Sequence, residues 1–380
     1  MTRHYSTFVL APHDSTAAES EEMDSVAVRR FPYFWPRRLQ KLADGKGILA
    51  NIRGSLLAWL QVPFFLFREA LAFARVVREN NIGIVNSHWL VPQGVIAAFF
   101  KKRYGFVHAI TVHAADVFLL NRLPFGKRVA RYIVENADLI IPVSKHNHDL
   151  LRGMAGRDFK SLILPMGVDV EFFGGSGATK PKAELSVDPS KRTILFVGKL
   201  TEKKGVVYLI RAMKELLTKL PDVQLAIVGD GYLRPELEKE SLELGNAVKF
   251  VGQKSRDEVR DYLQVAEALV VPSIIDRHGE TEGVPLVILE AMAAGRPIVA
   301  TDVGGNSQMV FHGENGYIVR EKDPSGIAES LLSLLSEGRA SGMGRKSLEI
   351  IKDLDWKIVG ERYKTAIEQS CRQPRPSHKP

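Results

Sequence analysis

Short runs of β-branched and other apolar residues alternate with helical patterns along most of the 380-residue chain. We expect strands at Gly83–Ser87, Val107–Val112, Leu139–Val143, Thr193–Gly198, Gln224–Gly229, Val248–Val251, Leu269–Pro272 and Ile298–Thr301. Helices are predicted between them, including Phe67–Glu79, Gly205–Leu220, Leu233–Leu244, Asp257–Val265 and Pro285–Ala294. Continuous apolar strands separated by helices are typical of buried parallel sheets, so the sequence predicts an α/β fold. The length allows two doubly wound, Rossmann-like domains.

Composition limits where the chain works and what it binds. The single cysteine, Cys371, excludes an internal disulfide and a cysteine-based zinc site. The most apolar stretch, residues 55–77, is interrupted by Gln61, Pro63 and charged residues, so we expect no membrane-spanning helix. The apolar run near the N-terminus is too short for a signal peptide, which predicts a cytoplasmic protein.

The net charge of +8 is concentrated in the first half of the chain. Residues 1–172 carry 22 lysines and arginines against 15 acidic residues, whereas the remainder is nearly balanced. Basic residues are densest after the aromatic residues at 31–35. They are Arg37, Arg38, Lys41, Lys46 and Arg53. This mixture predicts contact with an anionic membrane surface. The alternative is a solvated basic face with the rings in the core. A nucleic-acid partner is not expected, because no recognised binding motif accompanies the charge.

Several strand ends in the second half carry residues suited to a phosphate ligand. Lys199 and Lys204 flank a loop that leads into the helix expected from Gly205, an electropositive place with free amides. A Gly-Asp-Gly turn follows the strand at 224–229, and Gly304-Gly305 follow the strand at 298–301. Each feature has a structural alternative, since surface lysines and glycine turns between strand and helix are common.

Two carboxylates raise a separate question. Glu282 precedes the expected helix Pro285–Ala294, and Glu290 lies in its middle, although the preceding apolar residues leave the helix no polar face. Carboxylates are rarely buried without a partner, so the pattern predicts a ligand for them.

Polar residues also end two strands of the first half. His88 and His113 stand at these strand ends, and Asp116 follows three residues after His113. They are either ordinary core or loop residues or groups that orient a substrate or its phosphate. The sequence has no metal-binding spacing of the H-E-x-x-H or Cys/His kind.

In their order along the chain, these segments resemble the family-4 retaining glycosyltransferases, which have the GT-B fold. EGVPLVILEAMAAGRPIVATDVGG (282–305) resembles the E-x7-E region and its glycine pair. FVGKLTEKKG resembles the phosphate loop, AIVGDGYLRPELE the V-G-x-G turn, and KFVGQKSRDEVRDYL the base-binding strand and helix. ILPMGVDVEFF resembles the segment entering the hinge, and TVHAADVF the histidine-bearing loop. The resemblance covers roughly residues 80–370.

The resemblance implies a donor site for a UDP- or GDP-sugar, with no cofactor and no bound metal. Lys199 and Lys204 would hold the diphosphate, Glu290 the ribose hydroxyls, and Glu282 a hydroxyl of the donor sugar. Further donor-side residues would be Gly198, Val251, Lys254, Leu286, Gly304 and Gly305. His113 would lie near the transferred sugar or the acceptor. The implied catalytic residues are His113, Lys199, Lys204 and Glu282. His88 and Asp116 are the acceptor-side candidates.

The implied architecture is two Rossmann-like domains facing a cleft, at 1–173 and 193–355, separated by a Gly/Pro/Ser/Lys-rich linker at 174–192. A helix at 356–370 would cross back to the first domain, before a disordered tail at 371–380.

The chain departs from the family pattern at several places. Met166 stands where asparagine is usual, Pro285 replaces a glycine, and Gln308 stands where glutamate is common. The first strand-loop-helix unit of the family is expected to be lacking. We expect a retaining glycosyltransferase with a lipid-linked or glycan acceptor. The alternatives are a catalytically impaired nucleotide-sugar-binding protein and another GT-B enzyme, such as a nucleotide-sugar 2-epimerase.

Overall fold

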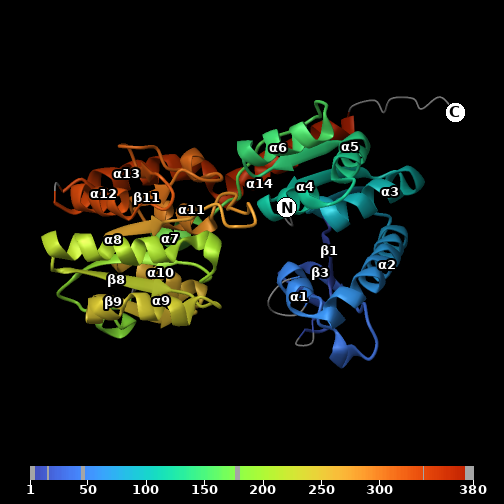
Figure 1. Cartoon of the computed structure of the whole chain (residues 1–380). Helices are drawn as coiled ribbons and strands as arrows, with labels where there is room; N and C mark the ends of the chain where they lie inside the picture. The colour runs from blue at the N-terminus through green and yellow to red at the C-terminus, as the bar shows by residue number, and fades with distance from the viewer. Residues whose placement is uncertain (1–4, 15–16, 44–47, 176–179, 337, 373–380) are drawn as a thin grey trace.

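The computed structural model describes residues 5–14, 17–43, 48–175, 180–336 and 338–372. The predicted tail from residue 373 onward, residues 176–179 of the predicted linker, and Lys46 of the basic segment lie outside these ranges. The chain forms two lobes that lie side by side, one made mainly of the first half of the sequence and one of the second half (Figure 1).

The C-terminal lobe is built on one parallel sheet of six strands, ordered β12-β11-β10-β7-β8-β9. The strands are β7 (Arg192–Val197), β8 (Val223–Val228), β9 (Val248–Gly252), β10 (Ala268–Val271), β11 (Ile298–Thr301) and β12 (Gly316–Val319). The helices are α8 (Val206–Lys219), α9 (Arg234–Glu240), α10 (Arg256–Val265), α11 (Leu286–Ala293), α12 (Pro324–Ser336) and α13 (Ala340–Ile351). Every residue of β8, β10 and β11 is buried, as expected where helices cover both faces of a sheet.

The N-terminal lobe contains two three-stranded sheets. One is parallel and consists of β4 (Ile84–His88), β5 (Val107–Val112) and β6 (Leu139–Pro142). The other consists of β1 (Phe8–Pro12), β2 (Ser20–Met23) and β3 (Val26–Phe31), with β2 and β3 forming a hairpin. The helices of this lobe are α1 (Ile48–Gly54), α2 (Leu56–Glu79), α3 (Val95–Tyr104), α4 (Ala114–Arg122), α5 (Gly126–Asn136) and α6 (Lys145–Ala155). Helix α7 (Val170–Gly174) follows them in the chain but packs against α11 of the C-terminal lobe (Figure 1).

No strand of the described ranges joins these two sheets, so the single doubly wound sheet expected for this half is divided into two. The lack of a first strand-loop-helix unit stays a prediction.

The last helix, α14 (Trp356–Arg372), contacts β5 and β6 of the N-terminal lobe. Its Tyr363 hydroxyl donates to Asn86 Oδ1 at 3.0 Å and also meets the Thr111 hydroxyl. The chain therefore leaves the N-terminal lobe, forms the second lobe, and returns to the first.

The helix α2 begins at Leu56, well before the predicted start at Phe67, and it contains Pro63. By length and composition alone it is apolar enough to cross a membrane, contrary to the expectation from sequence. In the structure it packs against α1, α3 and the β1–β3 sheet.

Part of the aromatic segment before α2 lies in the core. Phe31 and Tyr33 are buried against Phe65, whereas Trp35 is 79% exposed. The alternative that these rings belong to the core therefore holds for Phe31 and Tyr33 and not for Trp35.

Candidate functional site

The loops that follow the C-terminal-lobe strands pack against one another without room for side chains. A Cβ on Gly229 would lie 2.0 Å from the Gly198 carbonyl oxygen, and one on Gly231 would lie 2.3 Å from that of Leu200. The Gly-Asp-Gly turn thus holds the loop after β7 in place. Ligands of open α/β sheets bind at this edge, beyond the carboxyl ends of the strands.

Glu282 lies at the centre of the charged part of this edge. Its Oε1 is 3.2 Å from Lys203 Nζ and 3.4 Å from Lys204 Nζ. That buried oxygen accepts no well-directed hydrogen bond from the described residues, so it has capacity for a ligand hydroxyl. Burial alone would raise the pKa of Glu282, but the charges of Lys204 and Lys203 outweigh burial and lower it. The carboxylate is therefore ionised and held between two cations.

Gly304 and Gly305 determine where the Glu282 backbone lies. Gly304 has a φ of +60°, and a Cβ there would lie 2.0 Å from the Glu282 carbonyl oxygen. The Gly305 N–H donates to the Gly283 carbonyl at 2.6 Å. These contacts place the pair beside the Glu282 turn, which is a structural reason for both glycines besides the predicted approach to a phosphate.

Helix α11 leaves only one narrow face uncovered. All its residues are buried except Leu286 and Glu290, which lie four apart and so share a face. Among the described residues, no group hydrogen-bonds to or pairs with the Glu290 carboxylate. Burial raises its pKa, opposed by the charge of Arg256. Glu290 is thus only half-buried, and its carboxylate has no hydrogen-bond partner among the described residues.

The remaining donor-side candidates lie at neighbouring strand ends. Val251 is half-buried in β9 and packs against the main core, and Lys254 Nζ lies 3.5 Å from Glu258 Oε1. Lys199 is exposed. The ion pairs with Glu282 are made by Lys204 and by Lys203, which sequence reasoning missed, because nothing in the run Lys199–Lys204 distinguishes these side chains.

Two histidines meet at the strand ends of the N-terminal lobe. His88 Nδ1 and His113 Nε2 are 3.2 Å apart, and the rings are stacked. Burial, followed by the charge of His88, lowers the pKa of His113 to about 4. Burial also lowers the pKa of His88, because the ring is sheltered although the residue as a whole is exposed. Both rings are therefore neutral at pH 7, so they can offer a ligand hydrogen bonds but no charge.

Asp116 does not share that surface. Its side chain is fully buried, and it accepts from the N–H groups of Leu90 at 2.9 Å and Val117 at 3.0 Å. Burial raises its pKa to about 7 against these hydrogen bonds. Asp116 therefore holds the segment after β4 against the start of α4 and does not reach an acceptor directly.

The two lobes meet beside these residues. Helix α4 lies along the loop that carries Glu282: a Cβ on Gly283 would lie 3.4 Å from the Ala114 Cβ, and Arg122 pairs with Glu280 at 2.8 Å. The Lys145 N–H donates to Gln308 Oε1 at 3.1 Å. Since His113 directly precedes Ala114 and Glu282 directly precedes Gly283, the histidine pair and Glu282 lie next to this contact between the lobes.

A second feature that sequence reasoning missed is Arg256, at the start of α10. Its guanidinium lies 4.3 Å from the centre of the Phe172 ring and 3.6 Å from an Asp169 oxygen. The residues of the hinge segment thereby contact the helix that faces Glu290. Within the described ranges, no three His, Cys, Asp or Glu side chains form a cluster that could hold a metal ion.

Comparisons with known proteins agree with this arrangement. The family described as "Glycosyltransferase Family 4" matches residues 2–172, and the one described as "Glycosyl transferases group 1" matches residues 191–337. The D-inositol 3-phosphate glycosyltransferase of Corynebacterium jeikeium is 31% identical over 79% of this chain and 75% of its own. A GDP-mannose-dependent monoacylated α-(1-6)-phosphatidylinositol monomannoside mannosyltransferase of Corynebacterium glutamicum is 27% identical, covering 80% and 81%.

Two solved structures share the fold. Sucrose-phosphate synthase of Thermosynechococcus elongatus superposes with a TM-score of 0.76 at 22% identity, covering 96% of this chain and 88% of that one. Anabaena HepE in complex with UDP gives a TM-score of 0.73 at 17% identity, covering 96% and 100%. The predicted GT-B fold of two Rossmann-like domains is confirmed.

Proposed function

Because the chain belongs to the glycosyltransferases of group 1 and family 4, we propose that it moves a sugar from a nucleotide-diphosphate sugar to a hydroxyl acceptor with retention of configuration. The observation that carries the proposal is the position of Glu282. An ionised carboxylate with an unused oxygen sits between two lysines, just before the helix whose uncovered face carries Glu290.

The donor occupies the C-terminal lobe in this proposal. Glu290 accepts hydrogen bonds from the ribose hydroxyls, and the base lies near Val251 and Lys254. Lys199 and Lys204, with Lys203 added by the geometry, face the diphosphate. Glu282 accepts from a hydroxyl of the sugar. UDP and GDP are the preferred donor nucleotides, since HepE was solved with UDP and the C. glutamicum relative is named as GDP-mannose-dependent.

Transfer needs positive charge where the leaving group forms. The bond from the anomeric carbon to the diphosphate oxygen breaks, and the acceptor oxygen bonds to that carbon on the same face. The acceptor proton passes to the departing diphosphate. The lysines stabilise the developing negative charge, so no bound metal and no cofactor are required. Neutral His113, stacked on His88, hydrogen-bonds the transferred sugar or the acceptor.

The proposed acceptor is a glycan or a lipid-linked molecule, and the C. glutamicum relative is named for a phosphatidylinositol acceptor. We place the protein in the cytoplasm, at an anionic membrane surface that the basic N-terminal half contacts. Charge reversal at Arg37 and Arg38 should then lower its binding to anionic vesicles. Unchanged binding would remove the electrostatic part of this proposal.

The first test is calorimetric binding of UDP, GDP, ADP and CMP to the wild-type chain and to Glu290→Ala. We expect one nucleotide to bind, and the variant to lose roughly tenfold to a hundredfold in affinity because a charged acceptor of two hydrogen bonds is removed. Glu236→Ala, which removes an exposed carboxylate of the same lobe, serves as the control. Wild-type affinity in Glu290→Ala would reject the assigned role.

A turnover assay with the matching nucleotide sugars separates the remaining candidates. Binding without turnover would favour an impaired nucleotide-sugar-binding protein. A changed sugar without transfer would favour an epimerase.

A further inference from the structure

Helix α2 buries two polar residues, Gln61 and Glu69, on its inner face and exposes large apolar residues on its outer face. Gln61 is fully buried, accepts from the Lys41 N–H at 3.0 Å and donates to the Leu39 carbonyl at 2.6 Å. Glu69 lies about two turns further along the helix, is also buried, and accepts a hydrogen bond from Gln93 Nε2 at 3.0 Å. The opposite side carries leucine, tryptophan and phenylalanine. A helix as apolar as this is normally packed against other elements on most of its sides, whereas α2 is packed against them on one side only.

The uncovered side forms a continuous apolar stripe. Its members are Leu56, Trp59, Leu60, Pro63, Phe64, Phe67 and Leu71, which recur every three or four residues. Trp59 is 58% exposed and Phe67 is 63% exposed. At 1.5 Å per residue the stripe is about 22 Å long. Single exposed apolar side chains are ordinary, whereas a contiguous patch of this extent marks an interaction site.

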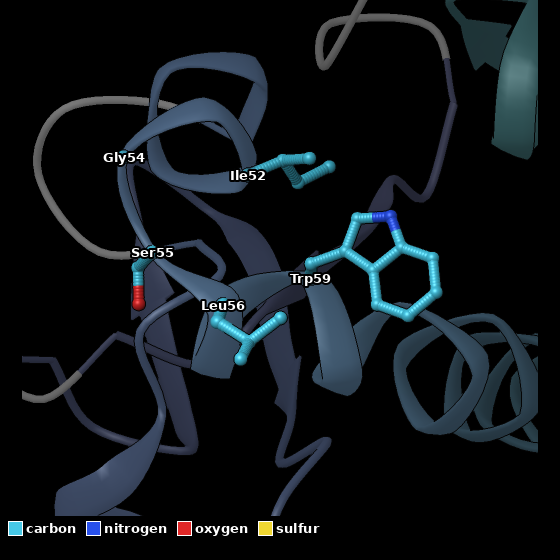
Figure 2. A pocket seen from close by; sticks show the side chains of 5 residues that line it. All are labelled: Ile52, Gly54, Ser55, Leu56 and Trp59. Atoms are coloured by element: carbon cyan, nitrogen blue, oxygen red, sulfur yellow. The ribbon is translucent and has the colours of Figure 1, made fainter.

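The stripe is hollowed at its first turn. Ile52, Gly54, Ser55, Leu56 and Trp59 line a shallow depression of about 550 Å³ where α1 meets α2. Figure 2 shows Ile52, Leu56 and Trp59 gathered around this depression. It can accept a branched apolar group or an acyl chain.

Basic residues lie along the stripe. The Phe34 ring meets the Phe64 ring at 5.6 Å, which brings the segment with exposed Trp35 to the stripe. In that segment Arg37 is exposed and pairs with Glu19, and Arg38 is exposed. Arg68 and Arg75 lie seven residues apart and so flank one side of the helix.

The local charge is strongly positive. Residues 35–79 contain eight lysines and arginines against three acidic residues, of which Glu69 is buried. An apolar face with cations at its edge matches an anionic lipid surface.

We propose that α2 lies in the plane of an anionic bilayer, with this stripe in the acyl boundary and the neighbouring arginines at the phosphate level. The buried hydrogen bonds of Gln61 and Glu69 keep the helix in its lobe, so it lies on the membrane and does not cross it. The inference deepens the proposed membrane partner and rests on it, but it uses none of the donor-site residues. It locates the contact on α2.

The test is flotation of the full chain with vesicles of phosphatidylcholine and phosphatidylglycerol, compared with phosphatidylcholine alone. We expect the wild type to bind the anionic vesicles and to weaken with salt. Trp59→Glu/Phe67→Glu should bind at least tenfold more weakly, because two apolar anchors are replaced by charges. Leu242→Glu, which alters an even more exposed apolar residue of the other lobe, should bind like the wild type. Wild-type binding by the double variant would overturn the proposal.

A second readout does not depend on introduced charge. Brominated acyl chains should quench the fluorescence of Trp59, so quenching should fall in Trp59→Phe and stay unchanged in Trp356→Phe. Equal quenching in both variants would contradict insertion of the stripe.

The other partner that could cover the apolar stripe is a second copy of the chain. Sedimentation that shows a wild-type dimer, absent in the double variant, together with no vesicle binding would assign the face to self-association and overturn the proposal. Nucleotide calorimetry on the same variants should match the wild type. Loss of vesicle binding with retained nucleotide binding separates this proposal from the proposed donor site.

Discussion

Glu282 shows how a functional carboxylate is positioned by residues that have no side chain of their own. The Gly304-Gly305 turn touches the backbone of Glu282 and Gly283, and the two lysines approach the carboxylate from the loop after β7. The position of the Glu282 carboxylate thus depends on close backbone contacts, including the Gly305 N–H hydrogen bond to the Gly283 carbonyl.

Gly304→Ala should weaken binding of the nucleotide sugar more than binding of the free nucleotide. The new Cβ would lie 2.0 Å from the Glu282 carbonyl oxygen, so this turn has to shift. Gly313→Ala is the control, since Gly313 also has a positive φ, +83°, but nothing lies within 4 Å of the added Cβ. Calorimetry with both ligands gives the two affinities. Equal losses in the two variants would show that backbone strain alone is responsible.

Glu69→Gln should change how stability depends on pH. Burial raises the pKa of Glu69 from its ordinary 4.5 to about 7, against the hydrogen bond from Gln93. In this range the unfolded chain has released the proton and the folded chain retains it, so the free energy of unfolding falls as pH rises from about 4.5 to 7. The variant keeps the hydrogen bond and should gain up to about 3 kcal/mol at pH 8, with little change at pH 4. Denaturant unfolding at both pH values measures this. The variant should still lose some stability as pH rises, because burial also raises the pKa of Asp116 to about 7.

At the scale of elements, α11 and α14 show two ways in which a helix can carry polar groups through a core. Helix α11 keeps only Leu286 and Glu290 uncovered, at the edge where ligands of such sheets bind. Helix α14 instead half-buries Tyr363 and satisfies its hydroxyl with side chains of β4 and β5. The first arrangement leaves a carboxylate available, and the second fixes the helix on the other lobe.

Tyr363→Phe should lower the free energy of unfolding by roughly 1–3 kcal/mol, because a buried hydroxyl shared by two polar partners is lost. Thermal unfolding followed by circular dichroism measures the change. Tyr132→Phe, at a more exposed ring of the same lobe, should shift the melting temperature little. A Tyr363→Phe protein as stable as the wild type would mean that α14 is held by its apolar contacts alone.

At the scale of the whole molecule, polar contacts join the two lobes next to the candidate site. Arg122 pairs with Glu280, and Gln308 accepts from the Lys145 backbone. Glutamate at position 308 can accept the same hydrogen bond, so the departure from the family pattern preserves the contact.

Gln308→Ala should lower kcat/KM severalfold, whereas Gln308→Glu should retain it, because only alanine leaves the Lys145 N–H without its acceptor. Steady-state kinetics of the three proteins, with radii of gyration from solution scattering, test this. If alanine and glutamate behave alike, the contact has no part in bringing the lobes together.

The sequence predicted the C-terminal lobe well because parallel strands buried on both faces are continuous apolar runs. It predicted the N-terminal sheets less completely, since β2 is four exposed residues, Ser20–Met23, with no apolar signal. The start of α2 was misplaced because Pro63 and Gln61 read as interruptions, although one is tolerated in the helix and the other is satisfied inside the lobe. In the site, residue types and strand ends were predictable. The choice of Lys203 over Lys199, and the burial of Asp116, depend on side-chain directions that spacing does not encode.

The return of α14 to the first lobe has a consequence for the order of events on the ribosome. Asn86 and Tyr363 are 277 residues apart in sequence, so at ~10 residues per second about half a minute separates their synthesis. The strands of the C-terminal lobe, by contrast, are contiguous in sequence from β7 to β12. The later-made lobe can therefore complete its fold first, while the earlier-made β4–β6 sheet waits for the helix that covers it. Chains that end at residue 355 and have left the ribosome should contain a protease-resistant second half and a cleavable first half.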